Sequence, residues 1–275
     1  MMRVSIALAF ATGIAIAPVT AQAAVTFSAQ AGALAASVSF DVLPGSKLQV
    51  VLTNTSLTEA AEPTGVLTAV FFSGLNGLTP TSALLAAGST VINTVNNTGI
   101  YANQQPPGDN VGGEWAYNVV SGLPNGASAG ISSSGLGIFG GANFNGPNLQ
   151  NPVALDGMQY GIVPASSQSG GGNGGMDGNA FIRNSVVFVL DNYTGGAAGL
   201  AGINNLSFQY GTALSEPNLV PNAPPPTCSN GNPYPYCGTG GNSTSVPEPM
   251  SAMVLTVGLL GLGLMRRQVA RRATT

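Results

Sequence analysis

Short runs of alternating apolar and polar residues recur along the chain between Val25 and Tyr210, separated by glycine and proline. The clearest run is Leu34–Val42, which is followed by a Pro44-Gly45 turn and by a second alternating run that includes Leu48, Val50 and Leu52. A period of two is typical of β-strands, and the turn between the two runs predicts a hairpin. Because no helical period is evident outside the two ends of the chain, the sequence predicts an all-β fold.

Further apolar runs extend this prediction to a β-sandwich-like domain. Gly65–Ser73 is continuously apolar at its centre, which predicts a strand buried on both faces. Phe181–Leu190 and Ile203–Tyr210 are expected to add core strands. The segment Ser121–Asn179 is dense in Gly, Asn and Ser, so we expect long loops there, because this composition buries little apolar surface. Shorter strands are expected at Val25–Ser28, Gly88–Asn93, Glu114–Val120, Gly135–Phe139 and Tyr160–Val163.

The N-terminus has the layout of a secretory signal peptide. Met1-Met2-Arg3 is followed by the apolar run Val4–Val19 and by the small residues of Ala21-Gln22-Ala23. This order of a basic, an apolar and a cleavage region predicts export, with cleavage after Ala23. The alternative is an N-terminal membrane anchor, which Pro18 and the Ala-Gln-Ala sequence disfavour.

The last thirty residues contain a polar motif, an apolar span and a basic cluster. Val246, Pro247, Glu248 and Pro249 precede the sixteen uncharged residues Met250–Met265. A helix of that length spans roughly 24 Å, slightly less than a hydrocarbon core of about 30 Å, so a single short transmembrane helix is expected. A buried core helix is the alternative, but it would not be apolar all round and end in four arginines. Those arginines, which favour a cytoplasmic tail, are Arg266, Arg267, Arg271 and Arg272.

This combination resembles the PEP-CTERM sorting signal of Gram-negative bacteria. The resemblance implies processing by an exosortase, a membrane-embedded enzyme similar to cysteine transpeptidases, near Pro247-Glu248-Pro249. It also implies a transient stay in the inner membrane, followed by release or transfer to the cell surface, outer membrane or extracellular matrix. Proteins of this family are often associated with exopolysaccharide and with biofilm or floc formation. The resemblance covers only the C-terminal end of the chain and implies nothing about the fold before it.

The sequence thus predicts four parts: a signal peptide over 1–23, an ectodomain over 24–214, a stalk over 215–245 and a sorting signal over 246–275. The stalk is rich in proline, which favours extended chain. It also contains the only two cysteines, Cys228 and Cys237. In an exported protein a disulfide between them is expected, with two free thiols as the alternative. We expect no metal site there, because no other soft ligand is nearby.

The exported part is acidic and sparsely charged. Its only basic residues are Lys47 and Arg183, and it contains nine acidic residues, so its net charge is −7. The whole chain has a net charge of −3, because four further arginines lie in the C-terminal tail. Binding to nucleic acid or to anionic lipid needs clustered Lys and Arg. The charge distribution therefore argues against both partners.

The absence of histidine excludes Ser-His-Asp and Cys-His catalytic sites as well as His-ligated zinc. Ser128 lies in a Gly-x-Ser-x-Gly pattern, but it lacks a histidine and a following helix. Two G-x-G-x-x-G matches, at Gly135–Gly140 and Gly170–Gly175, are also not followed by helix formers. We therefore predict a non-enzymatic protein without cofactors.

Carboxylate pairs leave a less favoured alternative, a glycoside hydrolase. Asp109 and Glu114 flank two glycines, and two carboxylates placed about 5–10 Å apart can hydrolyse a glycosidic bond. Glu59 and Glu62 lie beside Pro63, most simply in a solvated turn.

Three aromatic residues suggest a second alternative, a carbohydrate-binding module retained in a polysaccharide matrix. Trp115, Tyr117 and Tyr101 are close in sequence, and flat rings can contact glycans. The competing interpretation, which we favour, places Trp115 in the hydrophobic core as its single largest side chain.

Overall fold

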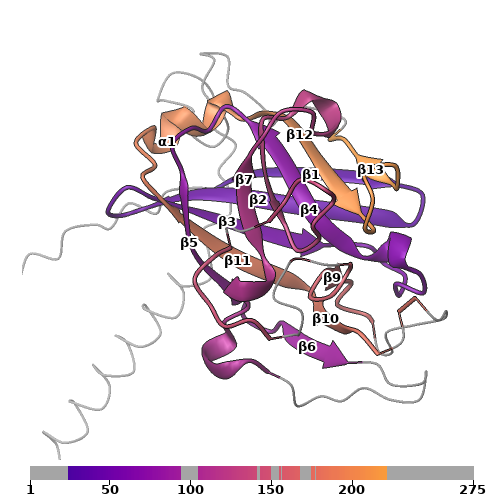
Figure 1. The fold of residues 1–275 in the computed structure, drawn as a ribbon. Coiled ribbons are helices and arrows are strands. Elements are labelled where there is room, and N and C mark those ends of the chain that lie inside the picture. The colour runs from indigo at the N-terminus through magenta and orange to yellow at the C-terminus, as the bar shows by residue number, and fades with distance from the viewer. Residues whose placement is uncertain are drawn as a thin grey trace, which may run out of the picture. The chain divides into compact units, whose positions relative to one another are not determined.

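The computed structural model describes residues 24–93, 105–140, 143–149, 155, 157–167, 175–176 and 178–221. Most of these residues lie in strands or in the connections between them, and the helical elements are short (Figure 1). The all-β prediction is therefore confirmed. Within the described ranges, no helix has the length and apolar character that crossing a membrane would require. The helical elements are α1 (Gly196–Gly199), η1 (Pro63–Gly65), η2 (Pro107–Asp109), η3 (Gly112–Glu114), η4 (Pro124–Gly126) and η5 (Leu200–Gly202).

One sheet, here called sheet A, has five antiparallel strands. The predicted hairpin is present, and a two-residue turn at Gly32-Ala33 joins a further strand to it. Gly32 has a φ of 59°, which suits the first central position of a type II′ turn. In spatial order the strands are β1 (Val25–Ala31), β2 (Leu34–Leu43), β3 (Lys47–Asn54), β11 (Ser185–Asp191) and β5 (Thr79–Leu85).

The second sheet, sheet B, has eight strands and branches at its centre. One side of β4 pairs with β12, and the other side is shared by β9 and β8. The β9 branch continues through β10 to β6, and the β8 branch ends at β7. The strands are β13 (Asn218–Leu219), β12 (Asn204–Tyr210), β4 (Leu67–Ser73), β9 (Ile162–Val163), β10 (Ala180–Arg183), β6 (Thr90–Asn93), β8 (Ala129–Ser132) and β7 (Ala116–Val119).

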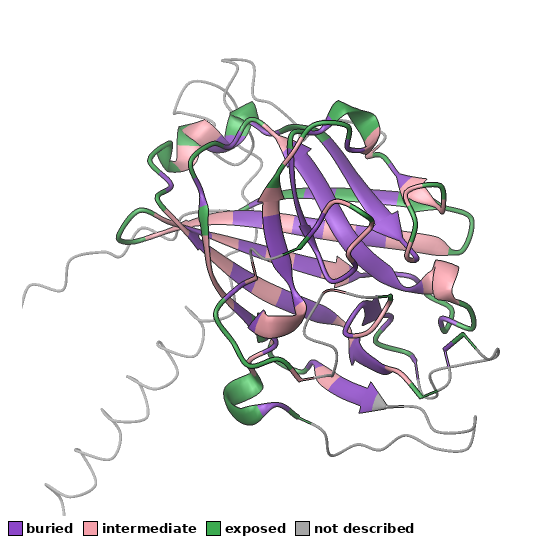
Figure 2. Cartoon of the chain, in the orientation of Figure 1, coloured by how far each residue is buried: buried purple, intermediate pink, exposed green. Residues whose placement is uncertain are grey.

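Both sheets contribute side chains to one main hydrophobic core. Alternate residues of β2 and β3 are buried, as the period of two predicts. Figure 2 shows that most strand residues are buried or intermediate, whereas many exposed residues lie in the connections. Phe40 of sheet A meets Phe72 of sheet B edge to face, with ring centroids 5.5 Å apart. Two sheets packed on a shared core is the layering that a β-sandwich requires.

The outer face of β4 is also buried. Phe71 points away from the main core into a smaller cluster with Leu123, Ala127 and Phe139. The first two of these come from the connection between β7 and β8, and the third comes from the turn after β8. The prediction of a strand buried on both faces at Gly65–Ser73 is thus confirmed. Gly135–Phe139, however, is a turn and not the predicted strand, because the Phe139 N–H donates to the Gly135 carbonyl.

The predicted continuous strand Phe181–Leu190 is two strands in different sheets. The break is at Asn184, whose φ of 87° lies in the left-handed region, where β-structure cannot continue. Asn184 keeps its backbone bonded at this corner, since its N–H donates to Val163 and its carbonyl accepts from Asn54. The chain therefore passes from β10 in sheet B directly into β11 in sheet A.

This corner gives a first prediction. Replacing Asn184 by valine is expected to lower the free energy of unfolding by about 1–2 kcal/mol, because a β-branched residue is strained at positive φ. Asn184→Gly, which tolerates this φ, is the matched control and should change stability by less than about 1 kcal/mol. Urea unfolding midpoints would check both. A valine variant as stable as the wild type would contradict a sheet-switching corner at this residue.

Strand β13 ends at Leu219, five residues beyond the predicted ectodomain boundary at residue 214, and the described chain ends two residues later. β13 pairs with β12 through only two residues. Gln209 of β12 is fully buried and secures the connection, because its Nε2 donates to the Ala213 carbonyl at 3.0 Å and its Oε1 accepts from Asn218 at 3.2 Å. The Glu216 carboxylate adds a second link by accepting the N–H groups of Thr212 and Ala213.

Candidate functional site

The proposed glycan contact through Trp115 and Tyr117 is wrong. Trp115 is completely buried and Tyr117 is 3 % exposed, so neither ring can stack on a sugar at the surface. Trp115 packs edge to face on Phe188, with ring centroids 5.0 Å apart, and thereby joins the two sheets. Burial also raises the pKa of Tyr117 to about 12. The favoured core interpretation is confirmed for Trp115, and Tyr101 lies outside the described residues.

Ser128 does not sit on a nucleophile elbow. Its Oγ donates to Ser73 Oγ at 3.2 Å, and strand β8 begins at the next residue where an elbow would need a helix. The local structure explains why both flanking residues are glycine. Gly126 has a φ of 71°, and a Cβ on Gly130 would lie 2.6 Å from the Phe71 ring. The Gly-x-Ser-x-Gly match therefore follows from a turn and from close packing.

The glycine-rich matches do not form a dinucleotide site within the described residues. Gly135–Gly140 contains a turn in which Gly137 has a φ of 73°, and the described residues 143–149 that come next contain no helix. Apart from Gly175, the residues of Gly170–Gly175 lie outside the described ranges. A phosphate-binding motif needs a glycine loop that opens a helix, so the first match fails this requirement.

The two carboxylates considered for glycoside hydrolysis have different surroundings. Asp109 is exposed at the end of η2. Glu114 is partly buried, and its Oε1 accepts the N–H of Leu149, which fixes the segment after Phe144 against η3. Glu59 and Glu62 are both exposed at a depression of about 230 Å³, in agreement with a solvated turn. Glu114 thus has a structural role as the acceptor that holds the backbone of Leu149.

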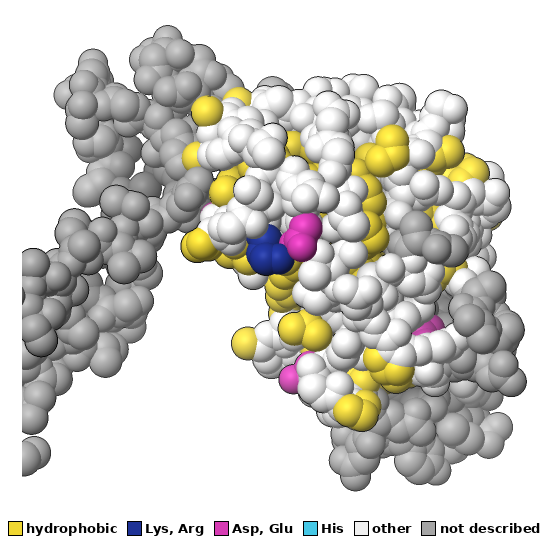
Figure 3. Space-filling view, turned by 60° about the vertical axis from the view of Figure 1, so that its left-hand side comes forward, with side chains coloured by type: hydrophobic (Ala, Val, Ile, Leu, Met, Phe, Trp, Pro, Cys, Tyr) yellow, Lys and Arg dark blue, Asp and Glu magenta, His cyan; other side chains and the backbone are white. Residues whose placement is uncertain are grey.

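Charge is sparse on the described surface. Lys47 at the start of β3 forms a salt bridge with Asp191 at the end of β11, and the hydrogen bond from the Lys47 ammonium lowers the pKa of Asp191. The face drawn in Figure 3 is mostly neutral polar and apolar, with few charged side chains. In the described ranges, no three or more Cys, Asp or Glu side chains are gathered so that they could hold a metal ion.

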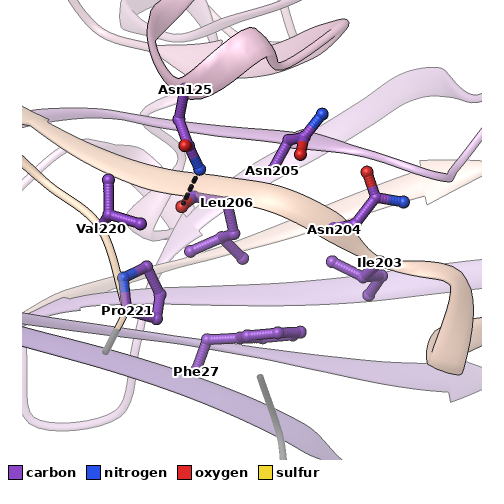
Figure 4. A pocket seen from close by; sticks show the side chains of 8 residues that line it. All are labelled: Phe27, Asn125, Ile203, Asn204, Asn205, Leu206, Val220 and Pro221. Carbon is purple, nitrogen blue, oxygen red and sulfur yellow. Dashed lines mark hydrogen bonds between the residues drawn. The ribbon is translucent and has the colours of Figure 1, made fainter. Parts of the chain in front are cut away.

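The structure does form a neutral groove between β1 of sheet A and the start of β12 of sheet B (Figure 4). Its volume is about 190 Å³. Phe27 of β1 lies on one side, and the start of β12 lies on the other. The remaining wall comes from η4 and from the two residues that follow β13. The lining residues are Phe27, Asn125, Ile203, Asn204, Asn205, Leu206, Val220 and Pro221.

Two asparagines fix the polar wall of this groove. Asn125 Nδ2 donates to the Leu206 carbonyl at 3.2 Å, and Asn205 Nδ2 donates back to the Gly126 carbonyl at 3.1 Å. Both asparagines have a positive φ, 56° and 51°, which asparagine tolerates better than most residues. This reciprocal pair joins η4 to β12. Within the described chain no donor reaches either carboxamide oxygen, so both remain available as acceptors.

The described residues that line the groove offer apolar surface and amide groups, but no group for acid–base or nucleophilic chemistry. Its lining contains no titratable side chain, hydroxyl or thiol. A volume below the roughly 300 Å³ at which pockets for drug-sized ligands begin suits a small apolar group with a nearby hydrogen-bond donor. Sequence analysis missed this groove. Its visible signals were Pro124-Asn125-Gly126 and Asn204-Asn205, which are turn-type residues far apart in the sequence, and only the fold brings them together.

Several predicted features lie outside the described residues. They are the sorting motif Val246–Pro249, the span Met250–Met265, the arginines 266, 267, 271 and 272, and the cysteines 228 and 237. No protein-family model, curated protein or solved structure matches the chain.

Proposed function

We propose that this chain is a non-enzymatic exported protein of the cell surface or extracellular matrix, which an exosortase sorts through its C-terminal signal. The observation that carries the proposal is the order Val246-Pro247-Glu248-Pro249, apolar span, arginine cluster, in a chain that also begins with a signal-like segment. An all-β body with a sparsely charged surface is compatible with work outside the cell.

The proposed architecture is a β-sandwich-like ectodomain on a proline-rich stalk. The described sheets end at Leu219, and prolines are frequent from Pro221 to Pro235. Proline fixes φ and favours extended chain, which would hold the ectodomain away from the membrane before processing. A disulfide between Cys228 and Cys237 would stiffen this stalk without touching the core.

The short apolar span supports a temporary anchor. Sixteen residues reach only roughly 24 Å as a helix, so the arginines behind Met265 would have to extend toward the headgroups. Such a span can hold the protein in the inner membrane until the enzyme reaches Pro247-Glu248-Pro249. The arginines would keep the tail on the cytoplasmic side during this time.

Association with exopolysaccharide is the further part of this proposal. It cannot use Trp115 and Tyr117, because both are in the core. The exposed Ser, Thr and Asn side chains of the sparsely charged surface are the groups left to contact glycans, and they would do so through many weak hydrogen bonds.

The test replaces Pro247, Glu248 and Pro249 together by alanine and compares cell fractions and C-terminal mass. We expect the wild type to lose the tail and reach the surface, and the variant to keep residues up to Thr275 and remain in the inner membrane. Alanine at Pro224, Pro225 and Pro226 is the matched control and should be processed normally. A wild-type protein that ends at Thr275 on the surface would contradict the proposal.

A further inference from the structure

Strand β1 forms one edge of sheet A and pairs only with β2. Its register with β2 is continuous from Val25↔Phe40 to Ala31↔Leu34, without a bulge. The strand contains no charged residue and no proline. Long, flat and uncharged edges are the ones to which another strand can add, because unpaired N–H and C=O groups line them.

The turn geometry indicates which backbone groups face outward. The two-residue connection makes Ala31 and Leu34 the closing pair, which bond to each other. Bonding then alternates along an antiparallel ladder, so Thr26, Ser28 and Gln30 direct their N–H and C=O groups away from β2. The side chains of these three residues are exposed. Within the described chain, no loop hydrogen bond reaches the outer edge of β1.

The other edge strands are β5, β6, β7 and β13, and each is protected. On β7, Ala116 forms an isolated bridge with Asn143. Along β5, the carbonyls of Ala83 and Thr81 accept the N–H groups of Val111 and Asn145. On β6, the Val91 N–H donates to Gln105 Oε1 at 2.8 Å. Strand β13 is only two residues long, and Pro221 follows soon after it. The contrast singles out β1 as the edge that can accept a partner.

We propose that a second copy of this chain pairs antiparallel along β1, with a two-fold axis at Ser28. This register is the one that brings all three outward-bonding residues into pairs, with Ser28 opposite Ser28 and Thr26 opposite Gln30. On the inner face, the large ring of Phe27 meets the small Ala29 of the other copy. The neutral groove, which Phe27 lines, then lies beside the junction.

The second copy is favoured over a charged or bulky partner by the chemistry of the strand. β1 carries no charge in a part of the chain whose net charge is −7, so self-pairing along this edge brings no like charges into direct contact. Two seven-residue strands alone form an interface well below the roughly 1,200 Å² of stable complexes. Pairing is therefore expected to be weak in dilute solution and to grow with concentration.

The test uses sedimentation velocity on the purified full chain over a concentration series that extends to about millimolar, the range in which a weak contact becomes populated. The wild type is expected to show a reversible monomer–dimer equilibrium. Ser28→Lys and Ser28→Glu should each weaken the dimer about fivefold, because identical charges face each other across the axis. An equimolar mixture of the two variants should restore the dimer to at least the wild-type level, since lysine then faces glutamate.

Ser37→Lys is the matched control. Ser37 is the cross-strand partner of Ser28 on the same face but one strand further in. In the paired sheets the two lysines introduced at position 37 would be three strand spacings apart, about 14 Å, beyond the screening length of about 8 Å at physiological salt. This control should therefore leave the dimer unchanged. Circular dichroism and thermal midpoints verify that all variants are folded.

Three outcomes would overturn the inference: a wild type that stays monomeric throughout, association that does not respond to the charge at residue 28, or a mixture that fails to recover the dimer. Association through the apolar C-terminal span would give the second of these. The inference does not depend on the sorting proposal, because all variants share the same C-terminal end.

Discussion

Replacing Trp115 by alanine is expected to lower the free energy of unfolding by about 3–5 kcal/mol, the range for removal of a large aromatic side chain from a core. Trp115 is completely buried and touches Phe188 across the two sheets. Phe188 also contacts Phe144, with ring centroids 5.2 Å apart. Alanine at position 115 would leave a cavity beside these two rings, which would lose their packing contacts with the indole. A loss of this size is a large share of the roughly 5–15 kcal/mol typical of whole domains.

Two controls separate packing from other effects. Trp115→Phe should cost clearly less than alanine, because it keeps one ring and removes a buried indole N–H that has no hydrogen-bond partner in the described chain. Val119→Ala, at a 62 % exposed position of β7, the strand that follows Trp115, should change stability by less than about 0.5 kcal/mol. Denaturant midpoints give all three values. An alanine variant that keeps wild-type stability but loses polysaccharide retention would return Trp115 to a binding role.

A second large effect is expected at Asn54, the last residue of β3, which is 2 % exposed. Its Nδ2 donates to the carbonyls of Ile162 at 2.9 Å and Gly65 at 3.2 Å, and its Oδ1 accepts the N–H of Ser56. The carboxamide thereby links sheet A to β9 of sheet B. Asn54→Asp keeps the shape but turns a carboxylate toward two carbonyl oxygens. Removing this donor from one buried and one partly buried carbonyl predicts a loss of about 1–3 kcal/mol or more at neutral pH.

The aspartate variant should also regain stability as the pH falls. Burial and the neighbouring carbonyls favour the protonated acid, so the folded-state pKa of the carboxyl introduced at position 54 would be raised above the unfolded value of about 3.9. Its destabilisation then appears as the pH rises through the folded pKa and is smallest below about pH 4. Urea unfolding at several pH values checks the trend. Asn192→Asp, at an exposed position, is the control and should show little change. Equal stability of Asn54→Asp and wild type at neutral pH would contradict the bridging role.

The strands of the first hairpin could be predicted because their information is local. Val38, Phe40, Val50 and Leu52 alternate with less buried residues, and this period alone predicts which side is buried. The double burial of β4 was equally visible as a continuous apolar run. These elements need no knowledge of distant contacts, since each strand carries its own pattern.

Other elements depend on distant partners and could not be predicted in this way. β8 lies in a Gly- and Ser-rich stretch and becomes a strand because Gly130 lets it approach Phe71 closely. β5 begins with Thr79-Pro80, which masks its strand character, and its position beside β11 is non-local. The corner at Asn184 lies within a largely apolar run, where an asparagine gives only a weak signal.

The alternative of a glycan contact through Trp115 and Tyr117 failed for a related reason. Period two places Trp115 and Tyr117 on one face but does not say whether that face meets water or the second sheet. The groove needed Phe27, Asn125 and Leu206, which are remote in sequence and adjacent only in the fold. Outward-facing edges such as β1 likewise become evident only when the strand order is known.

The link between β12 and β13 has a mechanical consequence. A force applied to the chain beyond Pro221 acts on β13 before it acts on the other strands. The two residue pairs that join β13 to β12 would then open one after the other. The next resistance is the buried Gln209 carboxamide, which holds both Ala213 and Asn218. A load on the chain beyond Pro221 would therefore be taken up at the margin of sheet B, and the long strands of the core would keep their register while the margin yields and recloses.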